Sequence, residues 1–264
     1  MHFSEMDYEV FPSPPDRKLV VDAGYLGTGR HISYGLVEVD VTRARELIKA
    51  HNERGGGKLS FTAFLIASLS EAIDAYPKVQ ACPDWRGRLV VFHDVDVVTM
   101  IEPSPGAVAI PYIIRGANHK TVQEISEEIR SIQSSKVRSE HLGLVALAPH
   151  LPRFVRLLFF KLLKKNPHWF KRMQGTVIVT SVGMFGKGGG WGVTFLPVNT
   201  LGLTVGGIAL KPGVYAGEIT IREYLSLTIA FDHDVVDGAP ATRFANRLIE
   251  LIESAAVLEV ETGD

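Results

Sequence analysis

A strand-like alternation that runs into a histidine and then into a helix is the strongest constraint on how this chain folds. Residues 224–231 alternate large apolar side chains with polar or small ones, which is typical of a β-strand, and residues 240–256 have helical spacing. His233, Asp237 and Gly238 lie between the two segments. A histidine between a strand and a helix is held rigidly and still reaches a ligand, although many such histidines are only structural. We therefore treat His233 as a candidate functional residue, with Asp237-Gly238 as a tight turn.

The composition limits the class of protein. The chain has 264 residues, of which 46% are hydrophobic, so it can form one well-buried domain or two small ones. A formal net charge of -1 favours no nucleic-acid surface. The single cysteine, Cys82, excludes an internal disulfide and fits a reducing, cytoplasmic location. No cluster of His and Cys has metal-ligand spacing, so we expect no metal site.

Several further elements follow from local patterns. The N-terminal residues 1–30 are rich in Pro and Gly, so we expect an extended arm there. Residues 32–41 alternate like a strand, and a helix follows to about Asn52. Ser60 is suited to cap the next helix, and Thr121 with Glu124 forms a capping box for another.

The segment around His233 also resembles a known family. Residues 226–233, then 235–239 and Arg243-Phe244, are similar to the end of the catalytic domain of dihydrolipoyl acyltransferases, the core subunits of 2-oxo acid dehydrogenase complexes. Chloramphenicol acetyltransferases share the shorter His-x-x-x-Asp-Gly pattern. With one exception, the resemblance extends from about residue 16 to 258. Further stretches that match in order are residues 38–42, 58–62, 76–81, 92–97 and 180–186.

The resemblance implies an α/β fold, a two-layer sandwich of helices on a mixed β-sheet, chloramphenicol acetyltransferase-like, over residues 31–264. It also implies a homotrimer with its active site between subunits, and trimers of this family sometimes build larger cages. The chain contains no lipoyl-carrying module and no Ala/Pro linker. We therefore expect a stand-alone core that is visited by a separate lipoyl-bearing or dehydrogenase partner.

The chemistry implied by the resemblance is acyl transfer between coenzyme A and a dihydrolipoyl thiol, with His233 as the general base. Asp237 would hold its turn through an ion pair with Arg17 of the N-terminal arm. The alternative for Arg17 is a solvated charge beside Lys18. Gly238 would permit the turn.

One position departs from the family's pattern. The family places a Ser or Thr hydroxyl after its glycine-rich loop to stabilise the oxyanion, and Gly190 stands at that position here. Loss of such a donor costs about 100- to 1000-fold in rate. Thr194, a backbone N–H of the glycine run or a water is the candidate replacement. Two functions therefore stay open, an acyltransferase and a catalytically weak oligomeric scaffold.

The exception to the resemblance is an extra basic, apolar helical insert at about residues 140–173. Within it, residues 151–172 join a broad apolar surface to several Lys and Arg side chains, and Pro152 and Asn166 suit the two ends of a helix. Such a helix lies on a membrane surface, or it packs on the domain or a neighbouring subunit. We keep both alternatives, including peripheral membrane contact through residues 151–172.

Overall fold

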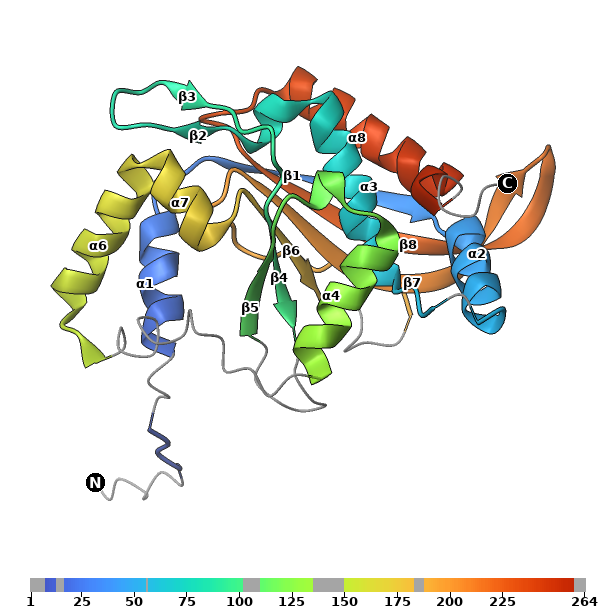
Figure 1. Ribbon diagram of the computed structural model, residues 1–264, viewed down its shortest axis with the longest axis horizontal. Coiled ribbons are helices and arrows are strands. Elements are labelled where there is room, and N and C mark those ends of the chain that lie inside the picture. Colours follow the sequence, from blue (N-terminus) through green and yellow to red (C-terminus); the bar gives the residue numbers. More distant parts are fainter. Residues whose placement is uncertain are drawn as a thin grey trace, which may run out of the picture.

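A six-stranded mixed sheet forms the centre of the molecule (Figure 1). The structure is a computed structural model that describes residues 8–12, 17–55, 57–101, 110–134, 150–182 and 188–258. The helices are α1 (Arg17–Gly27), α2 (Thr42–Glu53), α3 (Phe61–Ala75), α4 (Val122–Ser134), α6 (Arg153–Lys165), α7 (Pro167–Gln174) and α8 (Gly238–Ser254). The strands are β1 (Ile32–Asp40), β2 (Cys82–Pro83), β3 (Leu89–Val90), β4 (Val97–Ile101), β5 (Ile110–Ile114), β6 (Val177–Ser181), β7 (Leu201–Tyr215) and β8 (Glu218–Asp232).

The sheet has the strand order β1-β8-β7-β6-β4-β5. Strand β6 is parallel to both of its neighbours, β4 and β7, and the other pairs are antiparallel. Strands β2 and β3 form a separate two-stranded hairpin. The mixed sheet and its helical layer confirm the expected two-layer α/β fold.

Helices α2, α3, α4 and α8 cover one face of the sheet (Figure 1). The inward side chains of the strands, such as Val39, Leu203 and Leu227, are buried against this layer. Helix α3 lies deepest, with Phe64 and Leu69 fully buried, as its apolar sequence predicts.

The opposite face of the sheet has no helical layer among the described residues. On β1, Val37 and Val39 point into the core, so the alternating Tyr34 and Leu36 point the other way, where they are 40% and 52% exposed. A loop of residues 188–197 lies along this face, where the hydroxyl of Thr194 is hydrogen-bonded to β7. Its exposed apolar side chains are Trp191, Val193 and Phe195. We call Tyr34, Leu36, Trp191, Val193 and Phe195 the sheet surface.

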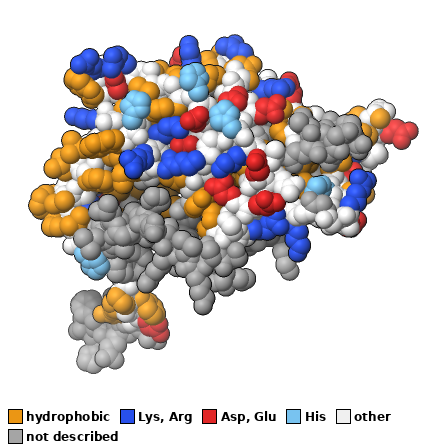
Figure 2. All heavy atoms as spheres, viewed as in Figure 1, with side chains coloured by type: hydrophobic (Ala, Val, Ile, Leu, Met, Phe, Trp, Pro, Cys, Tyr) orange, Lys and Arg blue, Asp and Glu red, His pale blue; other side chains and the backbone are white. Residues whose placement is uncertain are grey.

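Helices α1, α6 and α7 gather at one end of the molecule (Figure 1), where a space-filling view shows a band of hydrophobic side chains over α6 (Figure 2). The expected extended arm is wrong for residues 17–27, which form α1. Its buried Asp22 accepts hydrogen bonds from Arg153 and Arg156 of α6, at 3.3 and 2.6 Å. Long-range ion pairs therefore hold a helix whose glycines suggest a loop. None of the described helices is long and apolar enough to cross a membrane.

The local cap predictions are confirmed. The Ser60 hydroxyl accepts a hydrogen bond from the Ala63 N–H at 3.0 Å, at the start of α3. Before α4, the Glu124 N–H donates to Thr121 Oγ1, and the Thr121 N–H donates to the Glu124 carboxylate. Both caps depend on residues three positions apart, which is why the sequence predicts them.

Candidate functional site

His233 follows the last residue of β8, and hydrogen bonds hold its backbone on both sides. The His233 N–H donates to the His31 carbonyl at 2.7 Å, which continues the pairing of β1 with β8. The N–H groups of Val235 and Val236 both donate to the Asp232 carbonyl at 3.0 Å and close the turn into α8. The imidazole is exposed and has no hydrogen-bond partner among the described residues. The backbone is fixed, and the ring is free to meet a ligand.

Asp232 is the buried acid at this strand end. Its carboxylate pairs with Arg30 at 2.5 Å, and both side chains are almost fully buried. Arg30 also donates to the carbonyls of Leu196 and Asn199, at 3.1 and 2.8 Å. One guanidinium therefore joins the start of β1, the end of β8 and the loop before β7.

Sequence reasoning missed this pair. In the alternation of β8, Asp232 falls on the face of Thr228 and Ala230, opposite the core-facing Phe231, so the pattern gives no sign that its carboxylate is buried. The predicted pair of Arg17 with Asp237 is not formed in the single chain, where both side chains are exposed and no ion pair joins them. Arg17 begins α1, and the basic residue that the strand end uses is Arg30.

Asp237 and Gly238 occupy the boundary of α8. Asp237 is the N-cap residue with extended backbone, but its side chain makes no capping hydrogen bond. Gly238 is the first helical residue and is not among the glycines with positive φ. The prediction that Gly238 permits an unusual turn is therefore wrong. A Cβ at Gly238 would meet no atom within 4 Å, so this chain leaves open space beside the residue.

A second histidine lies beside His233. His31 Nδ1 is 2.8 Å from Asp234 Oδ1, and both groups are largely exposed. The hydrogen bond and the charge of Asp234 raise the pKa of His31 above 6.5. His31 is thus engaged by a carboxylate, whereas His233 has no such partner among the described residues.

A cavity of about 220 Å³ opens next to this turn. Its polar lining includes Thr28, Cys82, Lys164 and Asp234. Burial raises the pKa of the Cys82 thiol to about 11, so the group stays protonated and is a poor nucleophile. Burial, and then the charge of Arg30, lower the pKa of Lys164. The cavity suits a small group that approaches the end of β8.

Thr194 is not near His233 in the same chain. Its hydroxyl lies 2.8 Å from that of Thr204, and Thr204 pairs with Thr228 in the β7–β8 register. His233 follows Thr228 by five residues, which corresponds to about 17 Å along a strand. A site that uses both His233 and Thr194 therefore needs two chains.

Gly190 lies even farther from His233, next to Ser226 of β8. Its N–H points to Ser226 Oγ at 3.4 Å, and its carbonyl accepts from the Gly207 N–H at 2.9 Å. Its φ of +156° is one that L side chains rarely adopt, although the space around a Cβ is open. Backbone conformation therefore explains the glycine at this position. The preceding loop residues 183–187, of which 183–186 belong to the matching stretch, lie outside the described residues.

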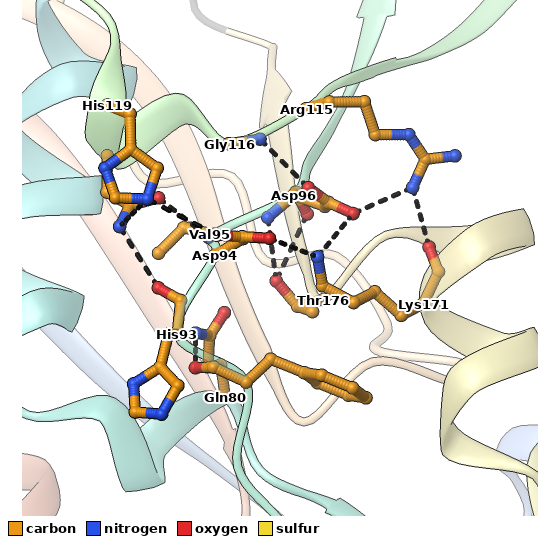
Figure 3. Close-up of polar contacts among 12 residues, drawn as sticks. Gln80, His93, Asp94, Val95, Asp96, Arg115, Gly116, His119, Lys171 and Thr176 are labelled. Atoms are coloured by element: carbon orange, nitrogen blue, oxygen red, sulfur yellow. Dashed lines mark hydrogen bonds and ion pairs between the residues drawn. The ribbon is translucent and has the colours of Figure 1, made fainter.

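The polar cluster around Asp96 has a structural role (Figure 3). Asp96 is buried and accepts hydrogen bonds from the Gly116 N–H, Arg115 and Lys171, at 3.0, 2.8 and 2.9 Å. Burial acts to raise the pKa of Asp96, but these three donors together hold it below its usual value. Lys171 belongs to α7, so the cluster attaches α7 to the sheet. Within the described ranges, no group of three or more His, Cys, Asp or Glu is placed to hold a metal ion.

Comparisons with known proteins agree on one family. The family described as "2-oxoacid dehydrogenases acyltransferase (catalytic domain)" matches residues 31–146 and 164–260. A lipoamide acyltransferase component of the branched-chain alpha-keto acid dehydrogenase complex from Pseudomonas putida is 26% identical over 241 residues. That match covers 88% of this chain and 48% of the relative, so the chain spans about half the length of such curated relatives.

Solved structures share the fold. A probable dihydrolipoamide acetyltransferase from Listeria monocytogenes has a TM-score of 0.68 and 20% identity, and the match covers 95% of this chain and 96% of that one. The cubic core of a pyruvate dehydrogenase multienzyme complex has a TM-score of 0.69 and 19% identity, covering 96% of each chain. A chloramphenicol acetyltransferase matches with a TM-score of 0.53 and 13% identity, covering 93% of this chain and 98% of that one.

The family match is interrupted at residues 147–163. This stretch is narrower than the insert of 140–173 expected from the sequence, and it contains most of α6. Helix α7 lies within the matched part, whereas most of α6, like α1, lies outside it.

Proposed function

Because this chain belongs to the family of 2-oxoacid dehydrogenase acyltransferase catalytic domains, we propose that it moves an acyl group between coenzyme A and a dihydrolipoyl-type thiol. The lipoyl group would be carried by a separate protein or segment, and a dehydrogenase complex would supply the acyl group. The observation that carries this proposal is the position of His233, whose backbone is fixed at the end of β8 and whose exposed ring has no hydrogen-bond partner among the described residues. Its neighbours Asp232 and Asp234 line the adjacent cavity.

His233 acts as the general base in this proposal. A thiol with a pKa near 8.5 is mostly protonated at neutral pH, so attack on a thioester requires removal of its proton. His233 accepts that proton while the sulfur bonds to the thioester carbonyl carbon. The tetrahedral intermediate then collapses, the bond to the other sulfur breaks, and His233 returns the proton to the leaving thiolate. No acyl-enzyme forms, so the absence of a reactive cysteine is no obstacle.

Asp237 supports this base through the backbone. It stands at the N-terminus of α8, where a carboxylate interacts favourably with the helix dipole. It therefore stabilises the turn that carries His233 and takes no part in proton transfer. The space beside Gly238 leaves room for a substrate or a neighbouring chain to approach the same turn.

The active site is completed by a second chain in a homotrimer. The uncovered sheet surface offers the apolar area for such a contact, and its residues on the 188–197 loop flank Thr194. The loop of one subunit would then face His233 of another, and the Thr194 hydroxyl would stabilise the oxyanion. The Thr194 hydroxyl can accept from Thr204 and still donate to an oxyanion, whereas the single N–H of Gly190 is directed at Ser226, so Gly190 is the weaker candidate.

The test is acyl transfer between acetyl-coenzyme A and free dihydrolipoamide, followed by loss of thioester absorbance. We expect His233→Ala to lower the rate by about 100- to 10,000-fold, as for removal of a general base. The matched control is His51→Ala, because His51 lies in α2, which packs near the opposite end of β8.

Two results would count against the proposal. Equal rates in wild type and His233→Ala would remove His233 from the mechanism. A wild type that is inactive with several acyl chains, yet trimeric by light scattering, would favour the scaffold function, in which the fold is kept without efficient chemistry.

A further inference from the structure

Helix α6 is apolar on two sides. It buries Leu163 and packs Phe160 inward, yet Phe154, Leu158 and Leu162 are 72%, 56% and 55% exposed while the charged Arg156 is buried. These three residues are spaced four apart, so they form one line along the helix. Phe159, which is 47% exposed, lies beside this line. We call Phe154, Leu158, Phe159 and Leu162 the α6 patch.

The orientation of α6 is set by a buried ion pair. Arg156 Nε lies 2.6 Å from Asp22 Oδ2, with the two side chains only 7% and 1% exposed. Arg156 also donates to the Leu151 carbonyl at 2.6 Å, and Arg153 adds a second contact to Asp22. If the helix rotated about its axis to bury this apolar line, Asp22 would remain as a buried, unpaired charge, which is strongly unfavourable. The patch therefore faces outward because the ion pair holds it there.

The surroundings of the patch are cationic. Residues 150–175 contain no Asp or Glu, and they contain seven basic residues, namely Arg153, Arg156, Lys161, Lys164, Lys165, Lys171 and Arg172. Three of them form ion pairs with acids from elsewhere in the chain. Lys161 and Lys165 are exposed on the outer side of α6 and form no ion pair within the described ranges. Figure 2 shows basic side chains along the upper border of the hydrophobic band.

The adjoining helix α7 adds exposed apolar side chains. Trp169 and Met173, four residues apart on α7, are 61% and 40% exposed. Tryptophan, with an apolar body and one N–H donor, is favoured where an apolar phase meets water. The patch thus combines an apolar line, a cationic border and an exposed tryptophan on the next helix.

We propose that the α6 patch docks this protein on an anionic membrane surface. Phe154, Leu158 and Leu162 enter the boundary between head groups and acyl chains, and Lys161 and Lys165 meet lipid phosphates. Helices with an apolar face bordered by Lys and Arg bind such surfaces by burial together with charge attraction. The contact is peripheral, and it adds a location to the proposed acyl transfer without depending on it.

Charge favours lipid over a two-fold contact with a second copy of the chain as the occupant. A two-fold contact through the patch would bring Lys161 and Lys165 of one copy against the same residues of the other. No acid in residues 150–175 is available to neutralise them. The family match also stops at residue 146 and resumes at 164, so most of α6 lies outside the residues that the family description matches.

The experiment is sedimentation of the full chain with vesicles of phosphatidylcholine alone or with 30% phosphatidylserine. We expect binding to the anionic vesicles that weakens as salt rises. The double variant Lys161→Glu, Lys165→Glu should bind about 10- to 30-fold more weakly. The double variant Leu158→Glu, Leu162→Glu should lose a similar amount, and both residues are already exposed, so folding is preserved.

Matched controls separate this idea from general effects. Lys49→Glu with Lys78→Glu makes the same charge change on other elements, and Val214→Glu with Ile219→Glu replaces exposed apolar residues at the tip of the β7–β8 hairpin. Both controls should bind as wild type, as should His233→Ala.

Binding of wild type to neither vesicle, or equal binding by the α6 variants, would overturn the proposal. A lipid-free oligomer that dissociates in Leu158→Glu, Leu162→Glu would assign the patch to a second copy. If vesicle binding were lost only in the control variants, membrane docking would be assigned to another surface.

Discussion

The sheet surface and the α6 patch are both apolar and both uncovered in the single chain, but the charges around them differ. Beside the sheet surface, Glu38 is paired with Lys211, and Asp40 with Arg222. Beside the α6 patch, Lys161 and Lys165 have no acidic partner within the described ranges. A surface with balanced charges can pack on another copy of itself, whereas an all-cationic border repels its own copy.

The two surfaces also differ in their relation to the family. The sheet surface lies within residues 31–146 and 164–260, which the family shares, and all four residues of the α6 patch lie in the interruption. Exposed apolar area alone indicates that something covers a surface. The neighbouring charges, together with the family boundary, indicate what that partner is.

The largest expected effect comes from placing a charge on the sheet surface. Leu36→Asp should dissociate the proposed trimer and lower the proposed acyl transfer by at least about 100-fold, since each site would lose the oxyanion donor of its neighbour. Light scattering and the thioester assay measure the two effects. In Leu158→Glu, a comparable change in the α6 patch, both should stay unchanged. A Leu36→Asp variant that is monomeric and fully active would show that one chain suffices.

The next effect concerns the ion pair that orients α6. Asp22→Asn leaves Arg156 buried without its carboxylate, which should destabilise the α1–α6 unit by about 3 kcal/mol. Hydrogen exchange of residues 153–165 should become faster, and vesicle binding should weaken as the helix loses its orientation. Glu250→Gln, which alters an exposed pair with Arg247, is the control and should change little. Unchanged exchange in Asp22→Asn would show that packing alone orients α6.

The smallest effect concerns the turn that carries His233, which belongs to neither surface. The hydrogen bond that His31 donates to Asp234 raises the pKa of His31, so NMR should show His31 titrating above 6.5. A raised folded-state pKa means that the pair stabilises the protein fully below pH 6.5, and that this contribution is lost as pH rises through the folded-state value. Asp234→Asn should return the titration toward 6.5 with little change in stability, because both groups are exposed. An unchanged titration would show that another group holds the His31 proton.

The parts of the fold that sequence predicted are those with local causes. Ser60 and Thr121 act through residues three positions away, and the alternation before His233 spans one strand. Helix α1 could not be predicted in this way, because Asp22 meets Arg156 from 134 residues away. Its Gly24 and Gly27 favour a loop until that partner is present.

The sequence identified the main candidate residue of the site, but it did not predict how the residues around it are arranged. The strand-to-helix junction identified His233, yet the resemblance suggested Arg17 as the partner of Asp237, whereas the strand end uses Arg30 as the partner of Asp232. The separation of Thr194 from His233 follows from the register of β7 and β8, which depends on pairing rather than on residue type. The interpretation of Gly190 depends on pairing in the same way. Its φ of +156° accompanies a bridge to Gly207 that the sequence does not show, so the sequence alone indicates only that a hydroxyl is missing there.

The position of Cys82 gives this protein a built-in reporter of motion. It is the sole cysteine, it is 5% exposed, and it lines the same cavity as Lys164 of α6. A thiol reagent reaches it only when the cavity opens, and its raised pKa keeps the background reaction slow. The labelling rate of the unmodified protein therefore measures how often α6 or the loop at Thr28 moves away. No engineered probe is needed to follow the cavity during turnover or on a lipid surface.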